Sequence, residues 1–102
     1  MSVVTDVNLH YKDLSQKILP IINAWLTARD FPPLKLIQDA NGGNKNPQIL
    51  LASGSYNFFP EKEFAKFIIN LDWEMEDNCV LLINPEEGQT KIYRPLNFSP
   101  MK

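Results

Sequence analysis

The side chains that most often bind metals are scarce in this sequence. His10 is the single histidine and Cys79 the single cysteine, and the two lie far apart along the chain. A zinc site needs several Cys and His ligands close together, so this pair predicts no metal site, and no cofactor is expected. We interpret His10 as a surface residue near the start of a helix. Cys79 is interpreted as a small buried residue at the start of a strand.

Nucleophilic and phosphate-binding motifs are also incomplete. Ser53-Gly54-Ser55 lacks the G-x-S-x-G spacing of a nucleophile turn, and a serine nucleophile would have only one histidine as its base. The glycine pair Gly42-Gly43 comes before a predicted strand, so no helix N-terminus would point at a phosphate. We interpret residues 53–55 as a break that ends a strand and residues 39–46 as a hairpin turn.

An acidic run lies at the expected end of the second helix and comprises Asp72, Glu74, Glu76 and Asp77. Carboxylates there face the negative end of the helix dipole, which is mildly unfavourable. A cation or a basic partner would offset this, but the EF-hand spacing is missing, and we interpret the run chiefly as a solvated loop. Trp73 and Met75 alternate with these acids and, if exposed, would mark an interface.

Length and charge limit the class of protein. The 102 residues suit a single domain, residues 1–102, and the net charge is −2 with basic residues scattered among acids. Nucleic-acid-binding proteins normally carry a basic stripe, so composition argues against that class. Every apolar stretch is interrupted by polar residues, which predicts no membrane span. The start lacks a signal-peptide pattern and a single cysteine suits a reducing compartment, so we expect a cytoplasmic protein.

Apolar periodicity and turn residues predict an α/β (α+β) domain with the element order α-β-β-α-β-β. One sheet of about four strands is expected to pack against a long N-terminal helix and a second helix. Cys79–Ile83 is apolar throughout and is the clearest core strand. The predicted elements are, in order, Asn8–Arg29, Leu34–Ile37, Gln48–Ala52, Pro60–Leu71, Cys79–Ile83 and Thr90–Arg94.

The predicted N-terminal helix has a wide apolar face. Pro20 lies inside it, and the missing N–H of proline predicts a kink there. Asp6 or Asn8 would cap the start by accepting a free backbone N–H. The residues that recur at steps of three and four on this face are Tyr11, Leu14, Ile18, Ile21, Trp25 and Ala28.

The second half of the chain carries a family resemblance. Leu81-Leu82-Ile83-Asn84-Pro85 reads as a strand that ends in Asn-Pro, and the chain returns through the pair Tyr93-Arg94 before Pro95. Upstream, Pro47-Gln48 leads into another predicted strand. On these residues, segment 47–95 resembles the Uma2 (DUF820) family, whose members have a restriction-endonuclease-like fold. The resemblance implies a nuclease ancestry for this segment.

The acidic residues that serve that family's chemistry are missing. Nucleases of this fold hold Mg²⁺ with carboxylates, because this hard ion takes oxygen ligands. Gln48 stands at the Asp position of the family, and Ala52 stands near its Glu. The resemblance therefore implies a truncated and catalytically inactive relative, and no catalytic residue is carried over.

We predict a non-catalytic interaction or regulatory domain that acts through a protein partner or through self-association as a dimer. The predicted contact residues are Trp73, Met75, Tyr93 and Arg94, of which the tryptophan and the tyrosine are chosen because these residue types dominate interface energetics. The alternative is a degenerate Uma2-like relative that keeps weak contact with nucleic acid through Lys45, Lys91 and Arg94. A small enzyme, the third hypothesis, would need a cleft that joins a basic residue to Glu61, Glu63 or Asp39.

Overall fold

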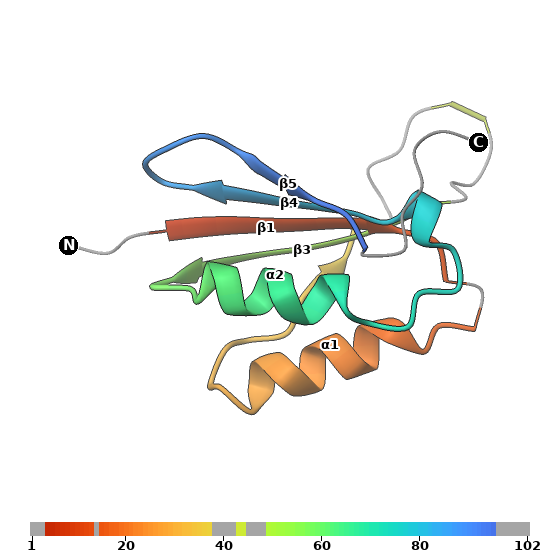
Figure 1. Cartoon of the computed structure of the whole chain (residues 1–102), viewed down its shortest axis with the longest axis horizontal. Coiled ribbons are helices and arrows are strands. Elements are labelled where there is room, and N and C mark those ends of the chain that lie inside the picture. The colour runs from red at the N-terminus through yellow and green to blue at the C-terminus, as the bar shows by residue number, and fades with distance from the viewer. Residues whose placement is uncertain (1–3, 14, 38–42, 45–48, 96–102) are drawn as a thin grey trace.

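The computed structural model describes residues 4–13, 15–37, 43–44 and 49–95. These residues form a five-stranded sheet, two α-helices and a short 3₁₀ helix, η1 (Figure 1). The predicted α+β class is therefore confirmed. In chain order the elements are β1 (Val4–Tyr11), α1 (Ile18–Thr27), β2 (Lys35–Leu36), β3 (Leu50–Asn57), α2 (Glu61–Ile69), η1 (Glu76–Asn78), β4 (Val80–Pro85) and β5 (Lys91–Tyr93).

The sheet is antiparallel throughout and has the strand order β2-β3-β1-β4-β5. The central strand, β1, pairs with β3 from Val4 opposite Asn57 to Tyr11 opposite Leu50. On its other side, β1 pairs with β4 from Thr5 to His10. Both strand edges of β1 are therefore occupied by hydrogen-bonded neighbours.

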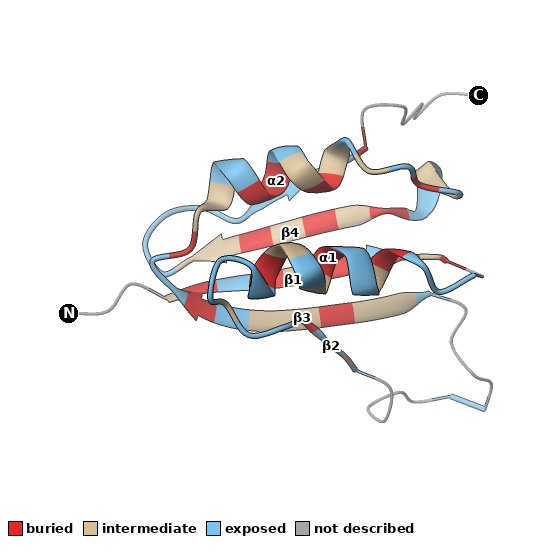
Figure 2. Ribbon diagram, turned by 90° about the horizontal axis from the view of Figure 1, so that it is seen from below, coloured by how far each residue is buried: buried red, intermediate tan, exposed pale blue. Residues whose placement is uncertain are grey.

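Both helices are crossover connections. Helix α1 links β1 to β2 and passes β3, whereas α2 links β3 to β4 and passes β1. The two helices lie side by side on the same face of the sheet (Figures 1 and 2). The molecule is thus a two-layer structure, with its core between the helices and one sheet face.

The predicted helix Asn8–Arg29 is wrong in its first part, because Asn8–Tyr11 belongs to β1. Along β1, Thr5, Val7, Leu9 and Tyr11 are buried while the residues between them are more exposed, which is the two-residue period of a strand. The observed order is therefore β-α-β-β-α-β-β, with five strands, and not the predicted α-β-β-α-β-β with about four.

Helix α1 begins at Ile18, and its start is fixed by Asp13. Asp13 is buried, and its Oδ2 accepts a hydrogen bond from the Ile18 backbone N–H at 2.9 Å. The predicted caps, Asp6 and Asn8, lie in β1 instead. Pro20 is the third residue of α1, where the backbone N–H has no partner within the helix. The reason to expect a kink at Pro20 therefore disappears.

The core lies between the helices and the central strands. Helix α1 buries Ile18, Ile22 and Leu26, at steps of four, whereas Ile21, which was predicted on the buried face, is 47% exposed. Trp25 packs edge-on against Phe64 of α2, with ring centroids 5.4 Å apart. The opposing sheet residues with no exposed area are Val7, Leu9, Ala52, Leu81 and Ile83.

The predictions for the second half of the chain agree more closely with the structure. The predicted helix Pro60–Leu71 contains α2, with Pro60 at its N-cap. The predicted strand Cys79–Ile83 corresponds to β4, and Thr90–Arg94 contains β5. Of the predicted turn 39–46, only residues 43–44 lie within the described part of the chain, and Gln48 lies outside it.

Ser53-Gly54-Ser55 lies inside β3, so the predicted strand break is wrong. Gly54 is opposite Val7 on the helix-covered face. A Cβ atom at Gly54 would lie 2.7 Å from the Tyr56 hydroxyl oxygen and 3.0 Å from Leu34 Cδ2. The Tyr56 hydroxyl donates a hydrogen bond to the Pro32 carbonyl at 2.8 Å. Glycine is needed here because the Tyr56 side chain lies across it.

The substitution Gly54→Ala is expected to lower the free energy of unfolding by about 1–3 kcal/mol, the usual cost of adding atoms to a filled space. Denaturant unfolding followed by circular dichroism measures this change. Ser53→Ala, on the opposite face of the same strand, is the control and should stay within about 0.5 kcal/mol of the parent protein. An unchanged unfolding midpoint for Gly54→Ala would contradict the close contact with Tyr56.

Candidate functional site

The sheet face opposite the helices, which we call the open face, carries no helix among the described residues (Figure 1). Side chains alternate between the two faces along each strand, so the register identifies those on the open face. His10 lies between Leu51 and Val80 in neighbouring strands. One step along β1, Asn8 is opposite Leu82, which in turn is opposite Ile92.

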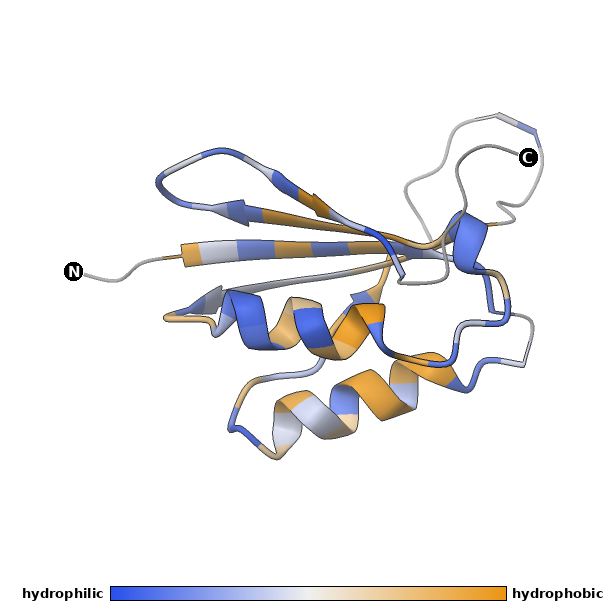
Figure 3. Ribbon diagram, in the orientation of Figure 1, coloured by the Kyte–Doolittle hydropathy of each residue, from blue (hydrophilic) through white to orange (hydrophobic). Residues whose placement is uncertain are grey.

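The end of the open face at His10 is rich in apolar side chains, and we call it the apolar half. Hydrophobic residues follow one another along β4 and recur in β5 (Figure 3). Ile92 is 65% exposed and Ile37 is 45% exposed. The Ile37 backbone N–H donates to the Leu51 carbonyl at 2.8 Å, which places Ile37 beside β3. The apolar half comprises Ile37, Ile49, Leu51, Val80, Leu82 and Ile92.

The other end of the open face is polar, and its side chains pair with one another across strands. The Ser55 hydroxyl donates to the Asp6 carboxylate at 2.6 Å, between β3 and β1. The Thr90 hydroxyl donates to Asn84 at the turn between β4 and β5. The polar side chains at this end therefore hydrogen-bond to one another. The apolar half instead exposes hydrophobic side chains, which form no hydrogen bonds.

The charges beside the apolar half are basic on its β1 and β2 side. Lys35 in β2 and His10 in β1 are both exposed on this face, and Lys12 follows β1 directly. No Asp or Glu occupies β2 or β5, or a described strand position beside His10 in β1, β3 or β4. This part of the surface therefore combines apolar area with positive charge.

Two of the four predicted contact residues lie on the helix side of the sheet. Trp73 is 7% exposed, its Nε1 donates to the Ile68 carbonyl at 2.8 Å, and its ring meets Tyr11 edge-on. The condition under which Trp73 would mark an interface, exposure, is therefore not met. Tyr93 is half-buried and opposite Leu81, so it too faces the helix layer.

The other two predicted contact residues lie near η1. Met75 is half-buried and is the N-cap of η1. Arg94 is exposed, and its Nη1 donates to the Asp77 carbonyl at 3.4 Å. This hydrogen bond connects the end of β5 to the segment that leads into β4. Arg94 and Met75 are therefore close to the same loop, but Trp73 and Tyr93 do not join them on one surface.

The residues proposed for contact with nucleic acid do not form one patch in the described part of the chain. Lys91 pairs with Glu61 of α2 at 2.7 Å, and the hydrogen bond with Glu61 raises the pKa of Lys91. Arg94 lies directly after the end of β5, and its guanidinium donates to the Asp77 carbonyl instead of joining Lys91 at α2. Lys45 lies outside the described residues.

Within the described residues the acidic side chains form no metal-binding cluster, since no group of three or more His, Cys, Asp or Glu side chains could hold a metal ion. Asp72 and Glu74, however, line a surface pocket beside Lys17. Glu61 pairs with Lys91, and Glu63 pairs with Arg29 at 3.6 Å. Within the acidic run, Glu74 accepts a hydrogen bond from Ser15 just before α1. Asp39 lies outside the described residues.

The fold and the open face together define a class, an antiparallel α+β sheet domain covered by helices on one side. Comparisons with known proteins found no family model, no curated protein and no solved structure that matches this chain. The Uma2 resemblance therefore stays a prediction from the sequence. Among the described residues, no helix has both the length and the apolar character needed to cross a membrane.

Cys79 lies directly before β4 and is 1% exposed, as predicted from the sequence. Burial raises the pKa of its thiol from 9.0 to about 12, although Arg94 lowers it in part. Because the thiolate is the reactive form, the Cys79 side chain in the folded protein is protonated and inert at neutral pH. Its role is to fill the core beside β4.

We expect Cys79 to react with a thiol reagent at pH 8 about a thousandfold more slowly in the native protein than in urea, because three pKa units reduce the thiolate fraction by that factor. Absorbance after mixing with a chromogenic disulfide measures both rates. A native rate within a few-fold of the rate in urea would show that the thiol is not buried as described.

Proposed function

We propose that this chain is a non-catalytic interaction domain that binds an acidic, partly apolar segment of a partner protein on the apolar half of the open face. The observation that carries the proposal is the exposure of Ile92 and Ile37, at 65% and 45%, on the sheet face that no described helix covers. Exposed apolar side chains grouped on one face of a domain commonly mark an interaction site.

Charge supports an acidic partner. Lys35 and Lys12 lie on or directly beside the apolar half, and the described strand positions there carry no carboxylate. Opposite charges across an interface speed association and disfavour partners of the wrong sign. An apolar segment with Asp or Glu side chains at its margin would therefore match both properties of this surface.

The size of the surface favours a short segment over a second copy of this chain. Five strands spaced about 4.8 Å apart, over four residues with a rise of about 3.4 Å each, present roughly 300 Å². A stable protein–protein interface buries about 800 Å² on each partner. A symmetric dimer through the apolar half alone would be weak, whereas a peptide of several residues could cover this area.

The proposal is tested by placing a photo-crosslinking amino acid at position 92 in cells that naturally express the chain. Crosslinks are expected to one partner, at a segment that contains both acidic and apolar residues. The same amino acid at Thr27, which is exposed on α1, is the positional control and should give no such product. A crosslink to a second copy of this chain would contradict the proposal.

The charge argument is tested with a pair of matched reversals. Lys35→Glu on the open face is expected to reduce the yield of the crosslink at position 92 severalfold, because it places a carboxylate beside an acidic partner. Lys62→Glu, which makes the same change on exposed α2, should leave the yield unchanged. Equal crosslink yields from the two variants would contradict the proposal that the partner is acidic.

A further inference from the structure

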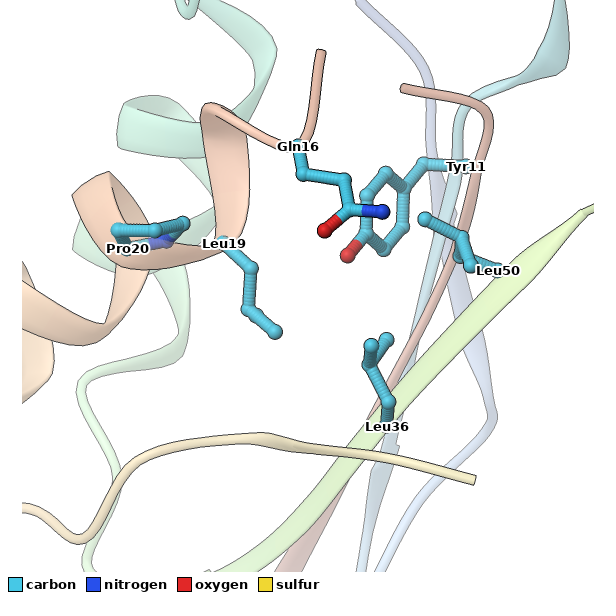
Figure 4. Close-up of a pocket in the computed structure, with 6 residues that line it drawn as sticks. All are labelled: Tyr11, Gln16, Leu19, Pro20, Leu36 and Leu50. Carbon is cyan, nitrogen blue, oxygen red and sulfur yellow. The ribbon is translucent and has the colours of Figure 1, made fainter. Parts of the chain in front are cut away.

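A separate cavity lies on the helix side of the sheet, between the start of α1 and the ends of β1, β2 and β3. Its volume is about 220 Å³ (Figure 4). The open face lies on the opposite side of the sheet, so this cavity is independent of the interaction surface. The residues that line it are Tyr11, Gln16, Leu19, Pro20, Leu36 and Leu50.

The Tyr11 side chain points its hydroxyl into this cavity (Figure 4). Tyr11 is 1% exposed, and its ring packs edge-on against Trp73 with centroids 6.0 Å apart. No hydrogen bond joins this hydroxyl to another described residue. The hydroxyl oxygen is not among the fully buried atoms that lack a partner, so it is accessible from the cavity. The hydroxyl is thus available to a molecule inside the cavity.

Gln16 supplies the second polar group. Its side-chain amide points into the cavity near the Tyr11 ring (Figure 4). Gln16 has a φ of 55°, in the left-handed region that costs a residue with a side chain roughly 1 kcal/mol or more. The Gln16 backbone N–H is held by the Asp13 carbonyl at 3.3 Å. Gln16 is exposed overall, but its side chain lines the cavity.

The lining also restricts the charge of a ligand. Leu19, Pro20, Leu36 and Leu50 are apolar, and no charged side chain lines the cavity among the described residues. Burial raises the pKa of Tyr11 to about 12, and the negative charge of Asp13 adds to this effect. The phenol therefore stays neutral and can donate or accept a hydrogen bond, while the nearby carboxylate disfavours an anion.

We propose that this cavity binds a small uncharged molecule with an apolar ring and one hydroxyl or carbonyl group. The ring packs against the leucine side chains, and the polar group hydrogen-bonds to the Tyr11 hydroxyl and the Gln16 amide. The volume agrees with this class, because a dry cavity of about 150 Å³ already accepts benzene. The extra space at this site accommodates a small substituent.

Benzyl alcohol and benzoate are suitable probes, because they share a ring and differ in charge. Titration of the full ¹⁵N-labelled chain followed by NMR is expected to show benzyl alcohol binding in the millimolar range, with shifts at Tyr11, Gln16 and Leu36. Benzoate is expected to bind at least tenfold more weakly. Absence of binding by benzyl alcohol, or tighter binding by benzoate, would overturn the proposal.

Two variants test the polar contacts to the ligand without disrupting the fold. Tyr11→Phe is expected to weaken the binding of benzyl alcohol about tenfold, the usual effect of one lost hydrogen bond. Tyr93→Phe, which removes a hydroxyl elsewhere, is its control. Gln16→Gly removes the amide but relieves the positive φ, so it should weaken binding several-fold without lowering stability. If both variants bind benzyl alcohol as the parent protein does, the assignment of these two residues is wrong.

Discussion

The whole structure depends on β1 being hydrogen-bonded on both edges while it is covered on one face only. Strand β3 pairs with β1 along its full length and β4 along most of it, and the two helical crossovers, α1 and α2, lie on the same side of the sheet. Buried positions of β1, such as Val7 and Leu9, therefore meet the helices, whereas Asn8 and His10 face away from them. The open face is a direct consequence of this topology.

The layer between sheet and helices is held together by aromatic packing and by side chains that satisfy backbone groups of the connecting segments. Asn23 of α1 accepts a hydrogen bond from the Leu34 N–H at 2.9 Å and donates to the Leu34 carbonyl at 3.3 Å, which ties the start of β2 to the helix. The Tyr56 hydroxyl donates to the Pro32 carbonyl, and the Tyr56 ring stacks on Phe59 with the ring centroids 4.9 Å apart. Polar atoms in this layer thus order the segments between elements, since a buried backbone group without a partner is costly.

The sequence predicts the second half of the fold well because proline and glycine mark its element ends, as Pro60 does for α2. It fails at the start because the apolar residues from Tyr11 to Trp25 recur at helical steps even though they belong to a strand and a helix, with a connecting segment between them. The sequence does not show whether Trp73 is exposed, because its burial depends on packing against Tyr11 of a distant strand. The exposure of Ile92 was not predicted, because strand alternation alone does not say which face of the sheet the helices cover. The unbroken apolar run Val80–Ile83 was the available signal, since a strand covered on one face needs only every second residue to be apolar.

The edges of the sheet bear on how a partner would reach this surface. An exposed strand edge invites the addition of another strand, and proteins limit this by keeping edge strands short and placing lysine on them. The outer strands here have two and three residues, and each carries a lysine, Lys35 and Lys91. Lys91 is further held against Glu61 of α2 at 2.7 Å, which ties that edge to the helix layer. Strand addition would therefore find few free backbone groups at either edge, whereas the apolar half presents side chains from β3, β4 and β5 and from residues directly beside β2 and β3. Contact through the face of the sheet is the mode that this arrangement favours.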